Sequence, residues 1–169
     1  DIHSQPLSIR NNIKKELGEF PFPSFWGPRA GIQSSQWIAD SAKWMESQYK
    51  PDLNLIYLPH LDYDFQRYGP NHPKSRQALK EIDDLAGSLI DFLTDRDVRC
   101  LVLSEYGITE VQRVIYPNRE FRHQGWLNIK EEFGLDTLDS GGSKVFALTD
   151  HQIAHIYLPE STPELRQKV

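Results

Sequence analysis

The chain has 169 residues, of which 38% are hydrophobic and 25% are charged, as in ordinary globular domains that bury a sizeable core. The formal net charge of −5 argues against a nucleic-acid partner, because such a partner needs a basic surface. No apolar run approaches the roughly 20 residues of a membrane span. The single cysteine, Cys100, lies in an apolar run, so we expect a buried thiol and a reducing compartment, the cytoplasm.

The first part of the chain predicts two helices joined by a proline-rich segment. Residues 6–18 predict a short helix, because a proline opens the segment and a glycine ends it. Residues 20–28, FPFPSFWGP, contain too many prolines for a helix or a central strand, and we call them the aromatic connector. We expect a packed loop there, with a pocket wall or lid as the alternative. Ser34 and Ser35 can cap a helix over residues 34–48.

A strand, a long helix and a second strand are expected in the middle of the chain. Residues 53–58 (LNLIYL) and 98–103 (VRCLVL) are short apolar runs typical of buried strands. Residues 75–93 place apolar side chains on one face of a helix and charges on the other. This order predicts a βαβ unit with parallel strands and a right-handed crossover. We therefore expect an α/β fold with a partial parallel sheet and flanking helices.

The last third of the chain carries shorter elements. Gly134 and the Gly141–Gly142 pair mark turns between weakly apolar segments. The expected elements are a short polar helix at 117–124 and short strands at 127–131, 136–138, 144–148 and 153–158.

Two loops leave the carboxyl ends of the predicted strands, and ligands of open α/β sheets bind at such ends. One loop lies within residues 58–70, LPHLDYDFQRYGP, and the other is SEYGI at residues 104–108. If the strands are parallel, Asp62 and Glu105 approach each other, which is unfavourable without a cation or a shared proton. Oxygen ligands suit magnesium, calcium or manganese, whereas carboxylates with a histidine suit zinc.

Other polar residues near these loops have open alternatives. Asp62 taken alone is either a structural residue, as a helix cap or a solvated charge, or a residue of a site. Asp64 is a second ligand or an exposed charge, and His60 is a structural residue or a hydrogen-bond partner of a carboxylate. His151 and His155 on an extended strand would be about 13 Å apart, too far for one metal. One histidine joining the carboxylates stays an alternative. No nucleophile motif occurs, so no catalytic residue is identified.

Residues 61–70, LDYDFQRYGP, resemble the motif of type I phosphodiesterase/nucleotide pyrophosphatases, in the alkaline phosphatase superfamily. In that motif an aspartate is followed four residues later by a metal-binding histidine, and then by glycine–proline. Asp62, Gly69 and Pro70 match this spacing. The segments FWGPRAGIQSSQWIADSAKWM, LSEYGI and DHQIAHIYL also look like this family. The resemblance implies an alkaline-phosphatase-like fold and metal-dependent hydrolysis of a small phosphate- or phosphonate-containing substrate.

The chain departs from the family pattern at the expected metal site. Gln66 stands where the family has a ligand histidine, and Glu105 and Tyr106 replace an aspartate–histidine pair. The resemblance implies that Asp62 and Glu105 bind a divalent metal, with zinc as a candidate. The residues expected to face the substrate or to support these ligands are Gln66, Tyr106, His60, Asp64 and His151.

The extent of the resemblance implies a central piece of a longer protein. The family's nucleophile strand and its final metal histidine are not found here. We expect a single partial α/β domain over residues 1–169, with residues 109–148 as a small α+β cap-like insertion. Such a fragment would be inactive alone and would need the remainder of its own chain. The alternatives are a non-catalytic binding protein with a degenerate metal site, and an assembly piece that is stable only against a partner chain.

Overall fold

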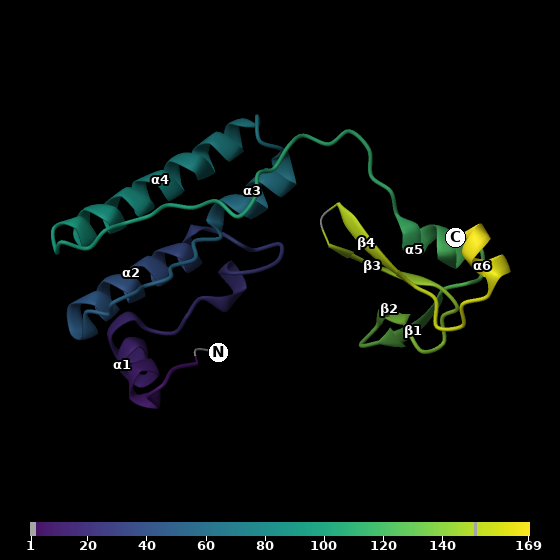
Figure 1. Cartoon of the computed structure of the whole chain (residues 1–169), viewed down its shortest axis with the longest axis horizontal. Helices are drawn as coiled ribbons and strands as arrows, with labels where there is room; N and C mark the ends of the chain where they lie inside the picture. Colours follow the sequence, from purple (N-terminus) through teal and green to yellow (C-terminus); the bar gives the residue numbers. More distant parts are fainter. Residues whose placement is uncertain (1–2, 151) are drawn as a thin grey trace. The chain divides into compact units, whose positions relative to one another are not determined.

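The computed structural model describes residues 3–150 and 152–169 of the chain. These residues belong to two compact units, Asp1–Val111 and Gln112–Val169. Figure 1 shows helices in the first unit and two small hairpins with short helices in the second. The expectation of one domain with an insertion at residues 109–148 stays a prediction.

The first unit is built from helices, and the sequence predicted the positions of α1, α2 and α4. They are α1 (Leu7–Leu17), the short 3₁₀ helix η1 (Phe22–Ser24), α2 (Ile32–Tyr49), α3 (His60–Tyr68) and α4 (Pro73–Thr94). The structure confirms the helices expected at 6–18, 34–48 and 75–93. Gly18 ends α1 in a left-handed conformation (φ 78°), which suits glycine.

The core of the first unit lies between α2 and α4. Its buried residues are Ala39, Ala42, Leu85, Leu89 and Leu93. The small side chains come from α2, so its backbone can approach the leucines of α4 closely. The prediction that Ser34 or Ser35 caps α2 was wrong, because both serines lie inside the helix. Gly31 occupies the N-cap position, and the Ser34 hydroxyl donates to the carbonyl of Ser24 at 2.9 Å.

The segment that we expected to be a loop at residues 58–70 contains the helix α3. Its sequence carries local helix signals that the loop prediction neglected. Asp62 lies in the first turn and Arg67 in the last, where each charge suits the helix dipole. Gly69, with φ 81°, ends the helix.

The expected parallel sheet does not form among the described residues. Residues 53–58 and 98–103 are extended but pair with no strand, and every strand pairing that the structure describes is antiparallel. As a result, Cys100 is exposed, not buried as predicted. Both segments are apolar, as the sequence analysis noted, but a β-strand also needs a neighbouring strand with which to form hydrogen bonds.

The second unit contains two antiparallel hairpins and two short helices. Its elements are α5 (Pro117–His123), β1 (Asn128–Glu132), β2 (Leu135–Asp139), β3 (Phe146–Asp150), β4 (Ile153–Tyr157) and α6 (Pro163–Lys168). The sequence analysis predicted all of these except α6, because it expected no element after residue 158. Phe121, Leu127 and Val145 belong to the core that holds the unit together. No helix of the described residues could span a membrane.

Candidate active site

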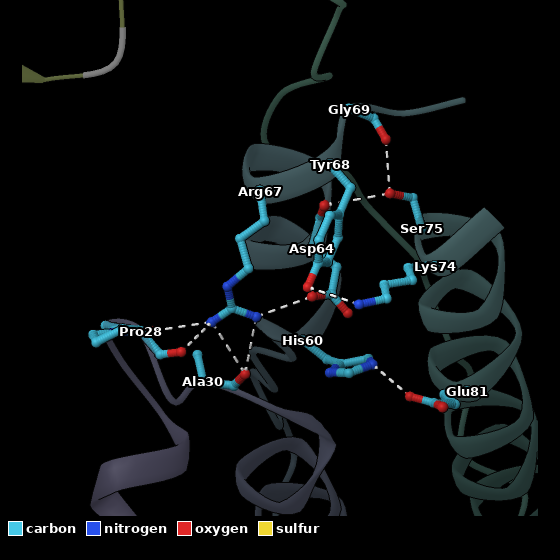
Figure 2. Close-up of polar contacts among 11 residues, drawn as sticks. Pro28, Ala30, His60, Asp64, Arg67, Tyr68, Gly69, Lys74, Ser75 and Glu81 are labelled. Atoms are coloured by element: carbon cyan, nitrogen blue, oxygen red, sulfur yellow. Dashed lines mark hydrogen bonds and ion pairs between the residues drawn. The ribbon is translucent and has the colours of Figure 1, made fainter. Parts of the chain in front are cut away.

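One side of α3 holds the aromatic connector in place (Figure 2). The Arg67 guanidinium donates hydrogen bonds to the carbonyl oxygens of Gly27, Pro28 and Ala30, at 3.2, 3.0 and 3.3 Å. It also pairs with the Asp64 carboxylate at 2.9 Å. A planar guanidinium suits this role because its donors form a rigid fork. The structure therefore places Asp64 in an ion pair that fixes Arg67.

The aromatic connector is packed, as the favoured prediction held. Phe20 makes edge-to-face contacts with Phe25 and with Trp37 of α2, at centroid distances of 5.3 and 5.2 Å. The backbone N–H of Gly27 donates to the Tyr63 hydroxyl of α3 at 3.0 Å. These contacts join the connector to two helices.

His60 and Ser75 join α3 to α4. The Nε2 atom of His60 lies 3.0 Å from a carboxylate oxygen of Glu81, and the histidine side chain is almost fully buried. The hydroxyl of Ser75, at the start of α4, donates to the carbonyl of Gly69 at 2.7 Å. The expected contact of His60 with a carboxylate exists, but Glu81 provides it.

The other side of α3 presents Asp62 to the segment that follows residues 98–103. The Asp62 Oδ1 atom accepts a hydrogen bond from the Tyr106 hydroxyl at 2.9 Å. Its Oδ2 atom accepts from the Gln66 side-chain amide, one helical turn along α3, at 2.8 Å. Gln66 and Tyr106 therefore hold the carboxylate directly.

The electrostatics show which groups surround Asp62. The hydrogen bond to Asp62 raises the pKa of Tyr106 to about 12, with smaller contributions from burial and from the charge of Glu105. Burial raises the pKa of Tyr57 above its usual value, and the charges of Asp62 and Glu105 raise it further. The carboxylates of Asp62 and Glu105 are therefore close enough to the phenols of Tyr57 and Tyr106 to raise their pKa values.

Tyr57 was missed in the sequence, although a signal was present. It belongs to the apolar run before α3 and lies five residues before Asp62. A tyrosine near the carboxyl end of a strand-like segment is well placed to face a site at that end.

A groove of about 1080 Å³ in the first unit is bordered by the two carboxylates and the two phenols, which are Asp62, Glu105, Tyr57 and Tyr106. Residues 98–103 and residues 53–58, with the exception of Leu55, line it together with apolar side chains of α4. Because Asp62 and Glu105 follow these two segments, the polar cluster lies where both segments end.

The described residues do not provide a complete metal site. They contain no group of three or more histidine, cysteine, aspartate or glutamate side chains placed to hold an ion. Both oxygens of Asp62 already accept a hydrogen bond, and Gln66 is a weak ligand. His151 lies outside the described residues. The metal roles of Asp62 and Glu105 stay predictions.

Comparison with known proteins agrees with the motif in α3. The family model for type I phosphodiesterase/nucleotide pyrophosphatase matches residues 3–166. A Schizosaccharomyces pombe protein named as an uncharacterized pyrophosphatase/phosphodiesterase is 32% identical over 78 residues, 43% of this chain and 16% of its own. The human ectonucleotide pyrophosphatase/phosphodiesterase family member 7 is 27% identical over 158 residues, 77% of this chain.

The chain spans 16% and 32% of the lengths of these two relatives. No solved structure matches it. The family model, in contrast, covers almost every residue, including α3, the Tyr106 segment and both hairpins. The chain belongs to the type I phosphodiesterase/nucleotide pyrophosphatase family.

Proposed function

We propose that the protein containing this chain hydrolyses a phosphodiester or a nucleotide pyrophosphate on an alkaline-phosphatase-like fold. The observation that carries the proposal is the convergence of Asp62, Tyr106, Glu105 and Tyr57 at the end of a large groove. Carboxylates and hydroxyls that meet in a cleft are typical of active sites. Family membership gives the reaction class.

Asp62 is the centre of the proposed site. The Tyr106 hydroxyl and the Gln66 amide fix the orientation of its carboxylate, and each oxygen keeps a lone pair for a further partner. Such a carboxylate can orient a water molecule or a cation near a phosphate. We propose that Asp62 and Glu105 contribute to a divalent-metal site whose other ligands lie outside the described residues. By itself, the chain would not turn over substrate.

The test uses the full-length polypeptide and bis(p-nitrophenyl) phosphate, a chromogenic phosphodiester. Asp62→Asn should reduce kcat/KM by about 100-fold or more, because it removes charge where the transition state is stabilised. Asp84→Asn is the matched control, since Asp84 is an exposed carboxylate of α4 that pairs with Lys80. Equal rates for both variants, with no divalent ion retained on dialysis, would contradict the proposal.

A second candidate is a binding protein without catalysis on the same fold. The observation in its favour is that neutral donors, Gln66 and Tyr106, occupy positions where the family pattern has histidines and hold both Asp62 oxygens. This function predicts binding of a phosphodiester without turnover. Calorimetry with a non-hydrolysable nucleotide analogue, together with the hydrolysis assay, separates the two functions.

A further inference from the structure

The hairpin formed by β1 and β2 lacks the packing that a two-stranded sheet needs. All five residues of β1 and the first two of β2 are exposed, and no other described element packs extensively against either strand. Leu138 at the base contacts the core of the unit, and an exposed ion pair joins Asp136 to Arg122 of α5 at 3.3 Å. A hairpin without a covering helix or a third strand is marginally stable in water. Residues 129–136, which we call the acidic arm, are therefore open to a partner.

The tip of the acidic arm carries a residue that is unfavourable for its turn. The two strands pair as far as Glu132 and Leu135. Between them, Phe133 and Gly134 form a two-residue turn with φ values of 54° and 74°. Such a turn favours asparagine, aspartate or glycine at its first position, because a bulky side chain resists a positive φ. Phe133 is nevertheless there, fully exposed, and a strained backbone position of this kind points to a function.

The charges of the acidic arm are also unfavourable for the hairpin itself. Glu131 lies directly opposite Asp136 in the register of the two strands, and like charges at opposite positions are destabilising. The arm has three carboxylates and a single lysine, Lys130. This lysine pairs with Glu132 at 2.7 Å, and among the described residues no cation pairs with Glu131. A cationic group supplied from outside the hairpin would therefore remove the repulsion.

We propose that the acidic arm docks onto another protein, at an apolar pocket surrounded by lysine or arginine side chains. Phe133 fills the pocket, with the exposed Leu135 beside it, because buried aromatic anchors supply much of the binding energy of protein interfaces.

Charge complementarity selects this occupant. Glu131 and Asp136 contact the basic residues around the pocket, which relieves their mutual repulsion and orients the partner. An anionic lipid surface would be repelled by the three carboxylates of the arm. The arm of a second copy carries the same charges and would be repelled as well. The docking surface therefore has a basic protein as its partner.

Photocrosslinking identifies the occupant of the arm. The full-length polypeptide is produced in cells of its source organism with the substitution Phe133→p-benzoylphenylalanine, and mass spectrometry maps each crosslinked residue. We expect a crosslink to another protein, at an apolar site with lysine or arginine side chains around it. A crosslink only to lipid, only to a second copy or only within the same polypeptide would overturn the proposal. A protein site without basic residues, or no crosslink at all, would overturn it too.

Phe133→Asn separates docking from folding of the hairpin. Asparagine suits the first position of this turn, so the variant should resist urea at least as well as the unaltered full-length polypeptide. Its Kd for the purified crosslinked protein, measured by isothermal titration calorimetry, should rise at least about 10-fold because the aromatic anchor is lost. A smaller rise in Kd would overturn the proposal.

A matched pair of charge substitutions tests the basic rim of the pocket. At low salt, Glu131→Gln should raise the Kd at least about 3-fold more than Glu160→Gln, an exposed carboxylate of the same unit outside the arm. The difference should vanish at about 1 M salt, where exposed charges are screened. Equal effects at low salt would overturn the proposal. Because no measurement uses hydrolysis, Asp62→Asn should dock with unchanged affinity, and a failed docking arm is distinguishable from a failed enzyme.

Discussion

The two sides of α3 carry the same kinds of residues, but the residues have different roles. On the clamp side, formed by Tyr63, Asp64 and Arg67, the partners are backbone groups of residues 27–30. On the site side, formed by Asp62 and Gln66, the carboxylate is held by two neutral side-chain donors beside the groove. Asp62 and Asp64 are two residues apart, yet within the described residues only Asp64 has a cationic partner, Arg67.

This difference offers a way to separate structural from functional carboxylates on one helix. A carboxylate paired with an arginine that binds backbone carbonyls stabilises the local fold. A carboxylate oriented by an amide and a phenol keeps its charge available to a ligand. We therefore expect substitutions on the clamp side to lower stability, and substitutions on the site side to change activity and titration instead.

Arg67→Ala should have the largest effect on stability. It removes hydrogen bonds from a charged donor to three carbonyls and leaves Asp64 without its cation, so we expect a loss of about 2–3 kcal/mol. Urea unfolding measures the change. Arg67→Lys is the control, and it should recover less than half of the loss because an ammonium lacks the planar fork. A loss below about 0.5 kcal/mol for Arg67→Ala would contradict the clamp.

Ser75→Ala should have the second largest effect on stability. Ser75 is fully buried, and its removal leaves the Gly69 carbonyl without the 2.7 Å hydrogen bond that joins α3 to α4. We expect a loss of about 1–2 kcal/mol in the same unfolding experiment. Ser88→Ala, an exposed serine of the same helix, should change stability by less than about 0.5 kcal/mol. Equal effects of the two variants would count against this link.

Tyr63→Phe should have a smaller effect on the clamp side. It removes only the hydroxyl that accepts the Gly27 N–H, so we expect a loss of about 1 kcal/mol. The ring stays, and so does its contact with the Arg67 guanidinium. The free energy of unfolding should therefore change little, while hydrogen exchange of the Gly27 amide becomes faster. An unchanged exchange rate would argue against the hydrogen bond between Gly27 and Tyr63.

Asp62→Asn on the site side should have the smallest effect on stability, below about 0.5 kcal/mol. Its readout is the titration of Tyr106, whose pKa of about 12 depends chiefly on the hydrogen bond to Asp62. The variant should bring this pKa back toward 10, which absorbance of the phenolate at alkaline pH can follow. An unchanged titration would show that Asp62 does not hold the phenol.

The raised pKa of Tyr106 also sets a pH dependence. Below pH 10 the phenol is protonated in both the folded and the unfolded state, so its contribution to stability is fully present. Between pH 10 and about 12 the unfolded state loses this proton first, and the contribution falls. The difference in stability between the protein and Tyr106→Phe should therefore shrink over this range.

Local patterns predicted most helices and both hairpins of the chain. Residues 75–93 carry a complete amphipathic face, and the glycine at 134 marks a hairpin turn, so each signal is contained in its own segment. The helix α3 was missed because nine residues give little periodicity, and its polar sequence resembles a loop. Its i,i+4 pair of Asp62 and Gln66 was the overlooked signal.

The sheet and the site depend on contacts that a single segment does not encode. Residues 53–58 read as a strand, but a strand is defined by its neighbour, and none of the described residues provides one. The meeting of the Asp62 and Tyr106 segments followed from topology, since both leave the same ends of the strand-like runs. The hydrogen bond from Gln66 to Asp62 is local to one helical turn, whereas the hydrogen bond from Tyr106 depends on how α3 is turned and could not be predicted.

The hydrogen bonds of Arg67 to the backbone of residues 27–30 also affect how easily proteases cleave the chain just after the aromatic connector. The connector is followed by Arg29, an exposed residue that trypsin would recognise, in a segment with little regular structure. Cleavage requires the backbone to enter the protease in an extended form, but the carbonyls on both sides of Arg29 are held from α3. The Arg29–Ala30 bond should become accessible only when α3 detaches, so the rate of nicking there reports how often this helix leaves the fold.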